Sequence, residues 1–274
     1  MKQTDVLFVA ALMLLASFVG IQAVRARTAS GRPEISTTSF GSSEDREANA
    51  RPLRNVARVP LSPRHDSVPA RSADVAAESR RRLREYASGT YINDVLIAHD
   101  SSLARWQDRR GTPLHVWIQE APPIADWNPD NAALVREAFI AWSEAGVPIN
   151  FTFVLDSSGA EVRVTWIDRF SEQISGKTLW THDDRWWIVG ADILLALHHR
   201  AGEPLDATAI RAISLHEVGH LVGLDHTTDT TSIMAPRVHT RDLSAADRAT
   251  VQLLYSLPPG SIRRQPPLPA QRDR

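Results

Sequence analysis

Apolar and polar residues alternate over several short stretches in the middle of the chain, as they do in half-buried β-strands. Leu114, Val116 and Ile118 are each separated by one residue of another kind, which predicts a strand over residues 114–119. Shorter apolar runs predict four more strands, the third of them followed by a polar turn. These lie within residues 149–155, 162–167, 178–189 and 191–197.

Apolar residues at three- and four-residue spacing predict the helices. One series is opened by Asn128 and Pro129 and stopped by Gly146, and proline suits the first helical position. The last helix begins with Ser244 and Asp247 in the spacing of a capping box. The two later helices are predicted over residues 204–224 and 244–257. The order of strand, helix, several strands and two helices indicates an α/β or α+β fold with a small sheet.

The chain begins with a strongly apolar segment. Residues 6–23 are almost wholly apolar and are followed by Arg25 and Arg27. Two interpretations of residues 1–27 stay open, a cleaved signal peptide or an uncleaved membrane anchor, because about 18 to 20 apolar residues can just span a bilayer. Both predict a protein that is exported, and is secreted or held at the membrane by this segment.

The rest of the chain divides into three parts by composition. Residues 28–88 combine a flexible tether rich in Ser, Arg and Pro with a charged helix over residues 73–87. Residues 89–258 are predicted to form one domain, and residues 259–274 a disordered tail.

Composition narrows the chemistry that this domain can perform. The chain has 43% hydrophobic and 23% charged residues, which is ordinary for a globular protein. A net charge of −1 gives no basic field that would favour nucleic acid as a partner. The absence of cysteine excludes disulfides, thiolate metal ligands, a cysteine nucleophile and thiol-based latency. The ten histidines remain as candidate metal ligands.

Three of these histidines lie close together near the end of the helix predicted over residues 204–224. His216 and His220 are four residues apart, so their imidazoles share one helix face and can bind one zinc ion. Glu217 follows the first histidine and can reach a water on that ion without being a ligand. Gly223 can adopt a positive φ, end the helix and bring His226 to the same ion. Three imidazoles and a water leave the open position that a catalytic zinc requires.

With the methionine of the run from Ser232 to Pro236, this pattern resembles the metzincin zinc proteases, and within them the matrixins. The resemblance covers about residues 103–258. It implies a twisted, mainly parallel sheet with one antiparallel edge strand and three main helices. It also implies a role for each matching residue: His216, His220 and His226 as ligands of one catalytic zinc ion, Glu217 as general base, Met234 as the base of the site, and Pro236, Val238, Leu179 and Trp180 as walls of the substrate pocket.

The chain departs from the matrixin pattern at other candidate metal positions. Matrixins often hold a second, structural zinc through histidines on two neighbouring strands. The matching positions here are Trp180 and Leu194, which cannot bind metal, so no structural zinc is expected. Calcium stays unassigned, with Asp183, Asp184 and Asp192 as candidates and a solvated turn as the simpler interpretation. Asp225 either orients a neighbouring group or is an exposed loop carboxylate.

Two functions are compatible with these features. The first is a zinc-dependent endopeptidase in which zinc polarises the scissile carbonyl of an extracytoplasmic protein or peptide, and Glu217 moves the proton of the attacking water. The substrate would then lie extended along the edge strand near residues 179–181. The second is a non-catalytic, membrane-tethered, zinc-containing module that binds peptides or cell-wall material. The sequence does not indicate an oligomeric state.

Overall fold

The computed structural model describes residues 71–263. The signal peptide or anchor expected at residues 1–27, the tether before residue 71 and the tail after residue 263 lie outside the described residues. Within residues 71–263, no helix combines the length and the apolar character needed to cross a membrane.

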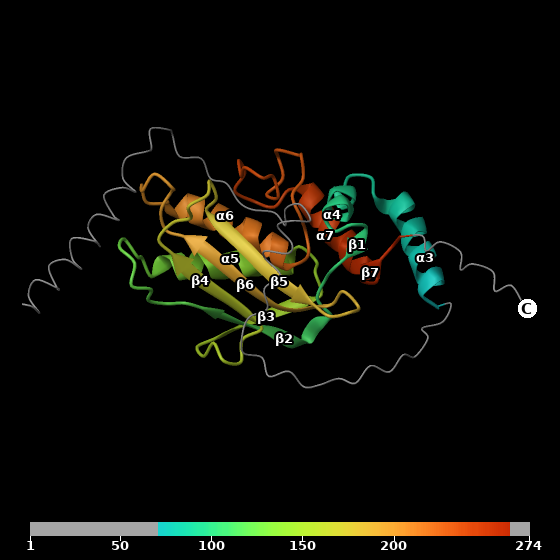
Figure 1. Cartoon of the computed structure of the whole chain (residues 1–274), viewed down its shortest axis with the longest axis horizontal. Coiled ribbons are helices and arrows are strands. Elements are labelled where there is room, and N and C mark those ends of the chain that lie inside the picture. Colours follow the sequence, from blue (N-terminus) through green and yellow to red (C-terminus); the bar gives the residue numbers. More distant parts are fainter. Residues whose placement is uncertain (1–70, 264–274) are drawn as a thin grey trace, which may run out of the picture. The chain divides into compact units, whose positions relative to one another are not determined.

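A five-stranded sheet forms the centre of the domain (Figure 1). Its strands stand in the order β3 (Ile149–Val154), β2 (Arg109–Ile118), β4 (Val162–Ile167), β6 (Ile188–Ala196) and β5 (Gly176–His182). The first four run parallel to one another, and β5 pairs antiparallel with β6 at the edge. This arrangement confirms the mainly parallel sheet with one antiparallel edge strand.

Two helices, α5 (Asp130–Glu144) and α6 (Ala207–Leu221), pack against each other and against the sheet (Figure 1). Phe139 of α5 packs edge-on against Phe151 and Phe153 of β3, with ring centroids 4.9 and 5.9 Å apart. Trp142 of α5 is fully buried, and its indole N–H donates to the carbonyl of Leu215 in α6 at 2.8 Å. The helix that carries the histidine motif is therefore fixed from its buried side.

The N-terminal and C-terminal ends of the described chain meet beside the last helix, α7 (Ala245–Ser256). Helix α4 (Ile92–Ala98) packs on α7, and β1 (Ser102–Leu103) pairs antiparallel with β7 (Gly260–Ser261). Residues 260–261 fall in the disordered tail expected over residues 259–274. Their pairing with β1 instead extends the folded domain past residue 258.

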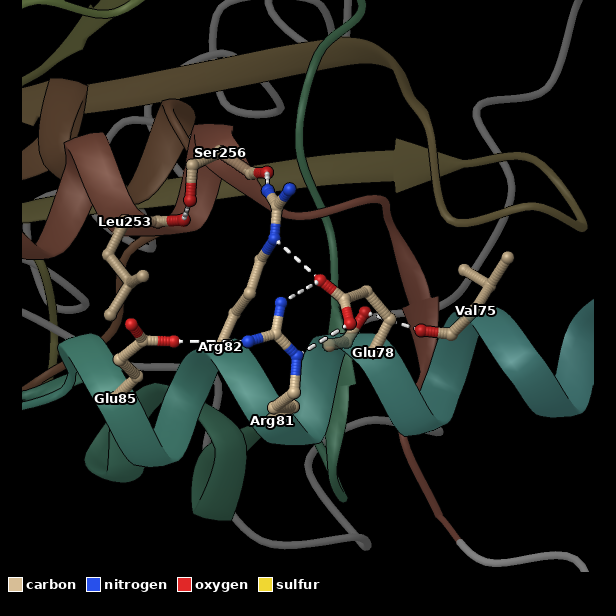
Figure 2. A network of polar contacts seen from close by, with 8 residues as sticks. Val75, Glu78, Arg81, Arg82, Glu85, Leu253 and Ser256 are labelled. Atoms are coloured by element: carbon tan, nitrogen blue, oxygen red, sulfur yellow. Dashed lines mark hydrogen bonds and ion pairs between the residues drawn. The ribbon is translucent and has the colours of Figure 1, made fainter.

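Helix α3 (Arg71–Tyr86) lies next to the end of α7, as Figure 2 shows. Arg82 donates to the carbonyl of Ser256 at 3.1 Å, and Arg80 to the carbonyl of Ile262 at 2.7 Å. Glu78 pairs with Arg81 within the helix at 2.7 Å, but both side chains are exposed, so this pair contributes little to the stability of the fold. The contacts to the C-terminal carbonyls therefore tie α3 to the domain.

Differences between expected and observed boundaries have local causes. Helix α6 begins at Ala207, three residues later than predicted, because Asp206 is the N-cap and its side chain accepts from Ala209 N at 2.7 Å. It ends at Leu221, before the positive φ of 99° at Gly223. The predicted capping box at the start of α7 is confirmed, with reciprocal hydrogen bonds between Ser244 and Asp247.

Candidate metal centre and active site

The end of α6 turns sharply and brings the third histidine back toward the first two. Leu224 N donates to Gly219 O at 3.1 Å, which closes the helix around Gly223. A Cβ atom on Gly223 would lie 2.3 Å from the carbonyl oxygen of Ala104, so the position requires glycine for space as well as for its φ. The turn predicted at Gly223 is present, and it carries the chain to His226.

The imidazoles of His216, His220 and His226 converge on one point. The Nε2 atom of His216 lies 3.0 Å from the Nε2 atoms of both His220 and His226. Among residues 71–263, these three form the only group of three or more metal-ligating side chains whose ligand atoms lie within 4.8 Å of one another. Two nitrogens bound to a tetrahedral zinc at about 2.0–2.1 Å lie about 3.3 Å apart, so the spacing fits that ion.

Backbone carbonyls fix which ring nitrogen faces the centre. The Nδ1–H of His216 donates to Ile233 O at 2.7 Å, and the Nδ1–H of His220 donates to Leu224 O at 3.0 Å. In this tautomer the Nε2 lone pair is the one that can bind an ion, and the carbonyl partners set the orientation of each ring.

Burial keeps the three rings in the neutral form that metal binding needs. Desolvation lowers the pKa of His216 well below its ordinary value, and the neighbouring imidazoles lower it further. Desolvation also lowers the pKa of His220, and it lowers the pKa of His226 to about 3. The donor set therefore fits a divalent ion such as zinc.

Glu217 is fully buried between α6 and the edge strand β5. Thr178 Oγ1 donates to its Oε2 at 2.7 Å, and a Cβ atom on Gly176 would lie 2.3 Å from its Oε1. Burial raises the pKa of Glu217 to about 8, against the opposing hydrogen bond from Thr178. Within residues 71–263 the Oε1 atom has no hydrogen-bond partner, so the carboxylate retains an acceptor for a donor outside the chain.

Met234 is fully buried and lies against the backbone of the histidine helix. A Cβ atom on Gly219 would lie 2.3 Å from the sulfur of Met234 and 3.0 Å from Cζ2 of Trp142. Glycine at position 219 therefore lets the methionine approach α6 closely. This contact explains why glycine occupies position 219, for which the sequence alone indicated no role.

Asp247 of α7 is a second residue whose role at the site the sequence did not reveal. Its buried carboxylate accepts from the hydroxyls of Ser232 and Tyr91 and from Ile233 N, the last at 3.1 Å. Because Ile233 O orients His216, the cap of α7 is connected to a ring of the metal centre through the turn before Met234. Only the capping-box spacing of Asp247 was visible in the sequence.

The four residues expected to line the substrate pocket occupy different environments. Pro236 is exposed and Val238 is buried. Leu179 pairs with Asp192, and Trp180 pairs with Ala191. Because neighbouring residues of a strand point to opposite faces, the side chains of Leu179 and Trp180 lie on opposite faces of the sheet. Trp180 faces the histidine helix, on the same side as Thr178. A role for these four residues in substrate binding stays a prediction.

The two positions matched to the structural zinc of other matrixins, Trp180 and Leu194, do not share a face of the sheet. Trp180 pairs with Ala191, whereas Leu194 pairs with Lys177, which places them on opposite faces of the sheet. The calcium candidates are also separated, because Asp183 accepts from two backbone N–H groups of the β5–β6 turn and Asp192 lies in β6.

Comparison with protein families agrees with this geometry. Residues 106–256, more than half of the chain, match the family model described as matrixin. The match begins at Trp106, after α3, α4 and β1, and includes the sheet, α6 and the turn that contains Met234. The resemblance inferred from the histidine motif is confirmed, and the chain belongs to the matrixin family of peptidases.

Proposed function

We propose that the protein is a zinc-dependent endopeptidase in which His216, His220 and His226 hold the ion and Glu217 is the general base. The observation that carries the proposal is the convergence of three neutral imidazoles beside a buried carboxylate with an acceptor to spare. A zinc ion bound there would supply Lewis acidity toward the scissile carbonyl.

The residues around the ion have distinct tasks in this proposal. The Oε1 atom of Glu217 accepts a hydrogen bond and then a proton from the attacking water, and the carboxyl group later gives that proton to the leaving amine. Burial raises the pKa of Glu217, which makes its carboxylate a stronger proton acceptor than an exposed one. Thr178 holds the other carboxylate oxygen in place.

The substrate is a protein or peptide, and we propose that it binds extended along β5. This strand is the edge of the sheet, and its outer backbone groups can pair with an added strand. Residues 179–181 lie just beyond Thr178 along β5, the strand that contacts Glu217. The export segment predicted at residues 1–27 supports a substrate outside the cytoplasm.

The test compares Glu217→Gln with the wild-type chain in a peptide-library cleavage assay analysed by mass spectrometry. We expect Glu217→Gln to retain one zinc per chain and to lose activity by about 10²–10⁴-fold, the usual contribution of a general base. Glu144→Gln, at an exposed position of α5, is the matched control and keeps full activity. Undiminished cleavage by Glu217→Gln would refute the role of Glu217, whereas a zinc-loaded wild type without cleavage would favour the non-catalytic binding module.

A further inference from the structure

A segment upstream of the matched residues reaches the loop that carries His226. Helix α4 is anchored by Ile92 and Val95, both fully buried, and is followed by a tight turn at Asp100 and Ser101, where φ is 54° and 60°. Residues 92–103 all precede residue 106, where the matrixin match begins. Their contacts with the candidate metal centre therefore come from outside the matched family domain.

Two side chains of this segment contact the residues on either side of His226. Asp94 accepts from the hydroxyl of Thr227 at 2.8 Å. The Nε2 atom of His99 lies 3.2 Å from Oδ2 of Asp225, within the distance of an ion pair. The third candidate ligand is therefore flanked on both sides by contacts to one short segment.

The contact between His99 and Asp225 is secluded from solvent and continues to the candidate ligand. His99 is 3% exposed and Asp225 is 1% exposed. The other carboxylate oxygen of Asp225 accepts from the backbone N–H of His226 at 2.6 Å. The buried carboxylate thus connects the ring of His99 to the backbone of His226.

The buried carboxylate of Asp225 has two neighbours, the ring of His99 and the backbone N–H of His226. A buried carboxylate that loses such a partner is costly, and it relaxes by moving toward water. Movement of Asp225 would displace the backbone N–H that it binds, and with it His226.

His99 also contacts the edge strand. Its ring packs edge-on against Trp180 of β5, with centroids 5.6 Å apart. The same imidazole therefore lies between the loop of the third candidate ligand and the strand that contacts Glu217 through Thr178.

We propose that His99 is a positioning residue for the metal centre, which holds His226 in place through Asp225 and makes the upstream segment part of the site. The inference rests on the proposed function, because it takes His226 to be a metal ligand. Loss of an outer partner of a metal ligand weakens metal binding by about 10–100-fold, and we expect a loss of that size here.

The experiment uses the full chain and measures metal binding separately from activity. His99→Phe keeps the ring volume and the packing on Trp180 but cannot contact Asp225 through a nitrogen. His99→Gln places an amide near the position of Nε2 and tests rescue. Zinc affinity is measured by competition with a chelator, the geometry of the centre by the visible spectrum of the cobalt-substituted protein, and the stability of the metal-free protein by urea unfolding.

We expect His99→Phe to bind zinc about 10–100-fold more weakly and to change the cobalt spectrum, and His99→Gln to recover most of both. Leu83→Ala, a buried substitution in α3 outside this segment, is the control: it lowers stability but leaves affinity and spectrum unchanged. Wild-type affinity and spectrum in His99→Phe, or equal changes in Leu83→Ala, would overturn the proposal.

The same measurements distinguish a failure of this proposal from a failure of the proposed endopeptidase function. Should His99→Phe fail to fold, Asp225→Asn weakens the same contact from the other side, and wild-type zinc affinity in that variant would overturn the proposal. A wild-type chain that binds zinc without cleaving peptides would refute the endopeptidase and leave the role of His99 standing. A wild-type chain that binds no zinc would overturn both.

Discussion

The close approach of Met234 to α6 makes a sharp prediction for the substitution Gly219→Ala. In most helix interiors this change stabilises the fold by about 0.5–1 kcal/mol, because alanine restricts the unfolded chain more than glycine does. Here the added Cβ atom would lie 2.3 Å from the sulfur of Met234 and 3.0 Å from the ring of Trp142. Neither neighbour has open space to move into, since Met234 and Trp142 are both fully buried.

The magnitude follows from these opposing effects. Insertion of a methyl group into a packed interior costs about 1–3 kcal/mol, and the helix preference of alanine returns about 0.5–1 kcal/mol of this. We therefore expect Gly219→Ala to lower the free energy of unfolding by up to about 2.5 kcal/mol, instead of raising it. Trp142 cannot relieve the contact easily, because its indole N–H is bonded to Leu215 O at 2.8 Å.

A double-mutant cycle assigns the cost to the methionine. Met234→Ala alone leaves a cavity and costs about 2–5 kcal/mol. If the two side chains compete for the same space, the alanine at 219 partly fills that cavity, so the double variant loses less than the sum by about 0.5–3 kcal/mol. Urea unfolding of the metal-free and zinc-loaded proteins measures each corner of the cycle.

Gly159→Ala is the matched control, because a Cβ atom there meets nothing within 4 Å. Its unfolding free energy should stay within about 0.5 kcal/mol of the wild type. If Gly219→Ala stabilised the protein, or if its effect and that of Met234→Ala simply added, the reasoning from this contact would be wrong.

Three further predictions follow from the same site. Gly176→Ala should displace the carboxylate of Glu217, whose Oε1 would lie 2.3 Å from the new Cβ, and reduce peptide cleavage with zinc content unchanged by metal analysis. In chelator, the free energy of unfolding should fall as pH drops from 6.5 toward 3, because burial lowers the pKa of His226 to about 3 and also lowers those of His216 and His220, so that only the unfolded chain takes up these protons. Each such group contributes up to about 1.4 kcal/mol per pH unit, and His226→Phe should reduce the slope by about that amount in urea titrations at several pH values. Asp247→Asn should cost about 2–4 kcal/mol in the same assay, because it weakens several buried hydrogen bonds to one charged acceptor.

The parts of the fold that were predictable are those encoded by local spacing. The short apolar run that predicted a strand over residues 162–167 matches β4 residue for residue. The capping box at Ser244 and the chain reversal at Gly223 follow from preferences of single residues, and both are present. The resemblance supplied what spacing could not, the parallel order of the strands and the antiparallel edge.

The expectations that failed depended on contacts or registers between distant segments. The strand predicted from Leu114 begins at Arg109, because Arg109 pairs with Ile149 of β3 across an irregular stretch of mostly exposed residues that shows no apolar alternation. Positions 180 and 194 were matched to a pair of residues on neighbouring strands, and the register of β5 on β6 places them on opposite faces of the sheet. A shift of one residue in register moves a side chain to the other face, and sequence spacing alone does not fix it.

The candidate metal centre shows the same division between local and distant information. Its three histidines and Glu217 fall within eleven consecutive residues, so helix geometry and one glycine suffice to bring them together. The groups that hold those rings come from elsewhere: Ile233 O is fixed by Asp247, and Asp225 is contacted by His99. From the sequence alone, Asp225 could equally be an exposed loop carboxylate. Because α4 packs against the loop, its carboxylate is buried between His99 and the backbone of His226. The metal motif can therefore be recognised in isolation, but its affinity for the ion depends on residues that lie outside it and, in the case of His99, outside the matched family domain.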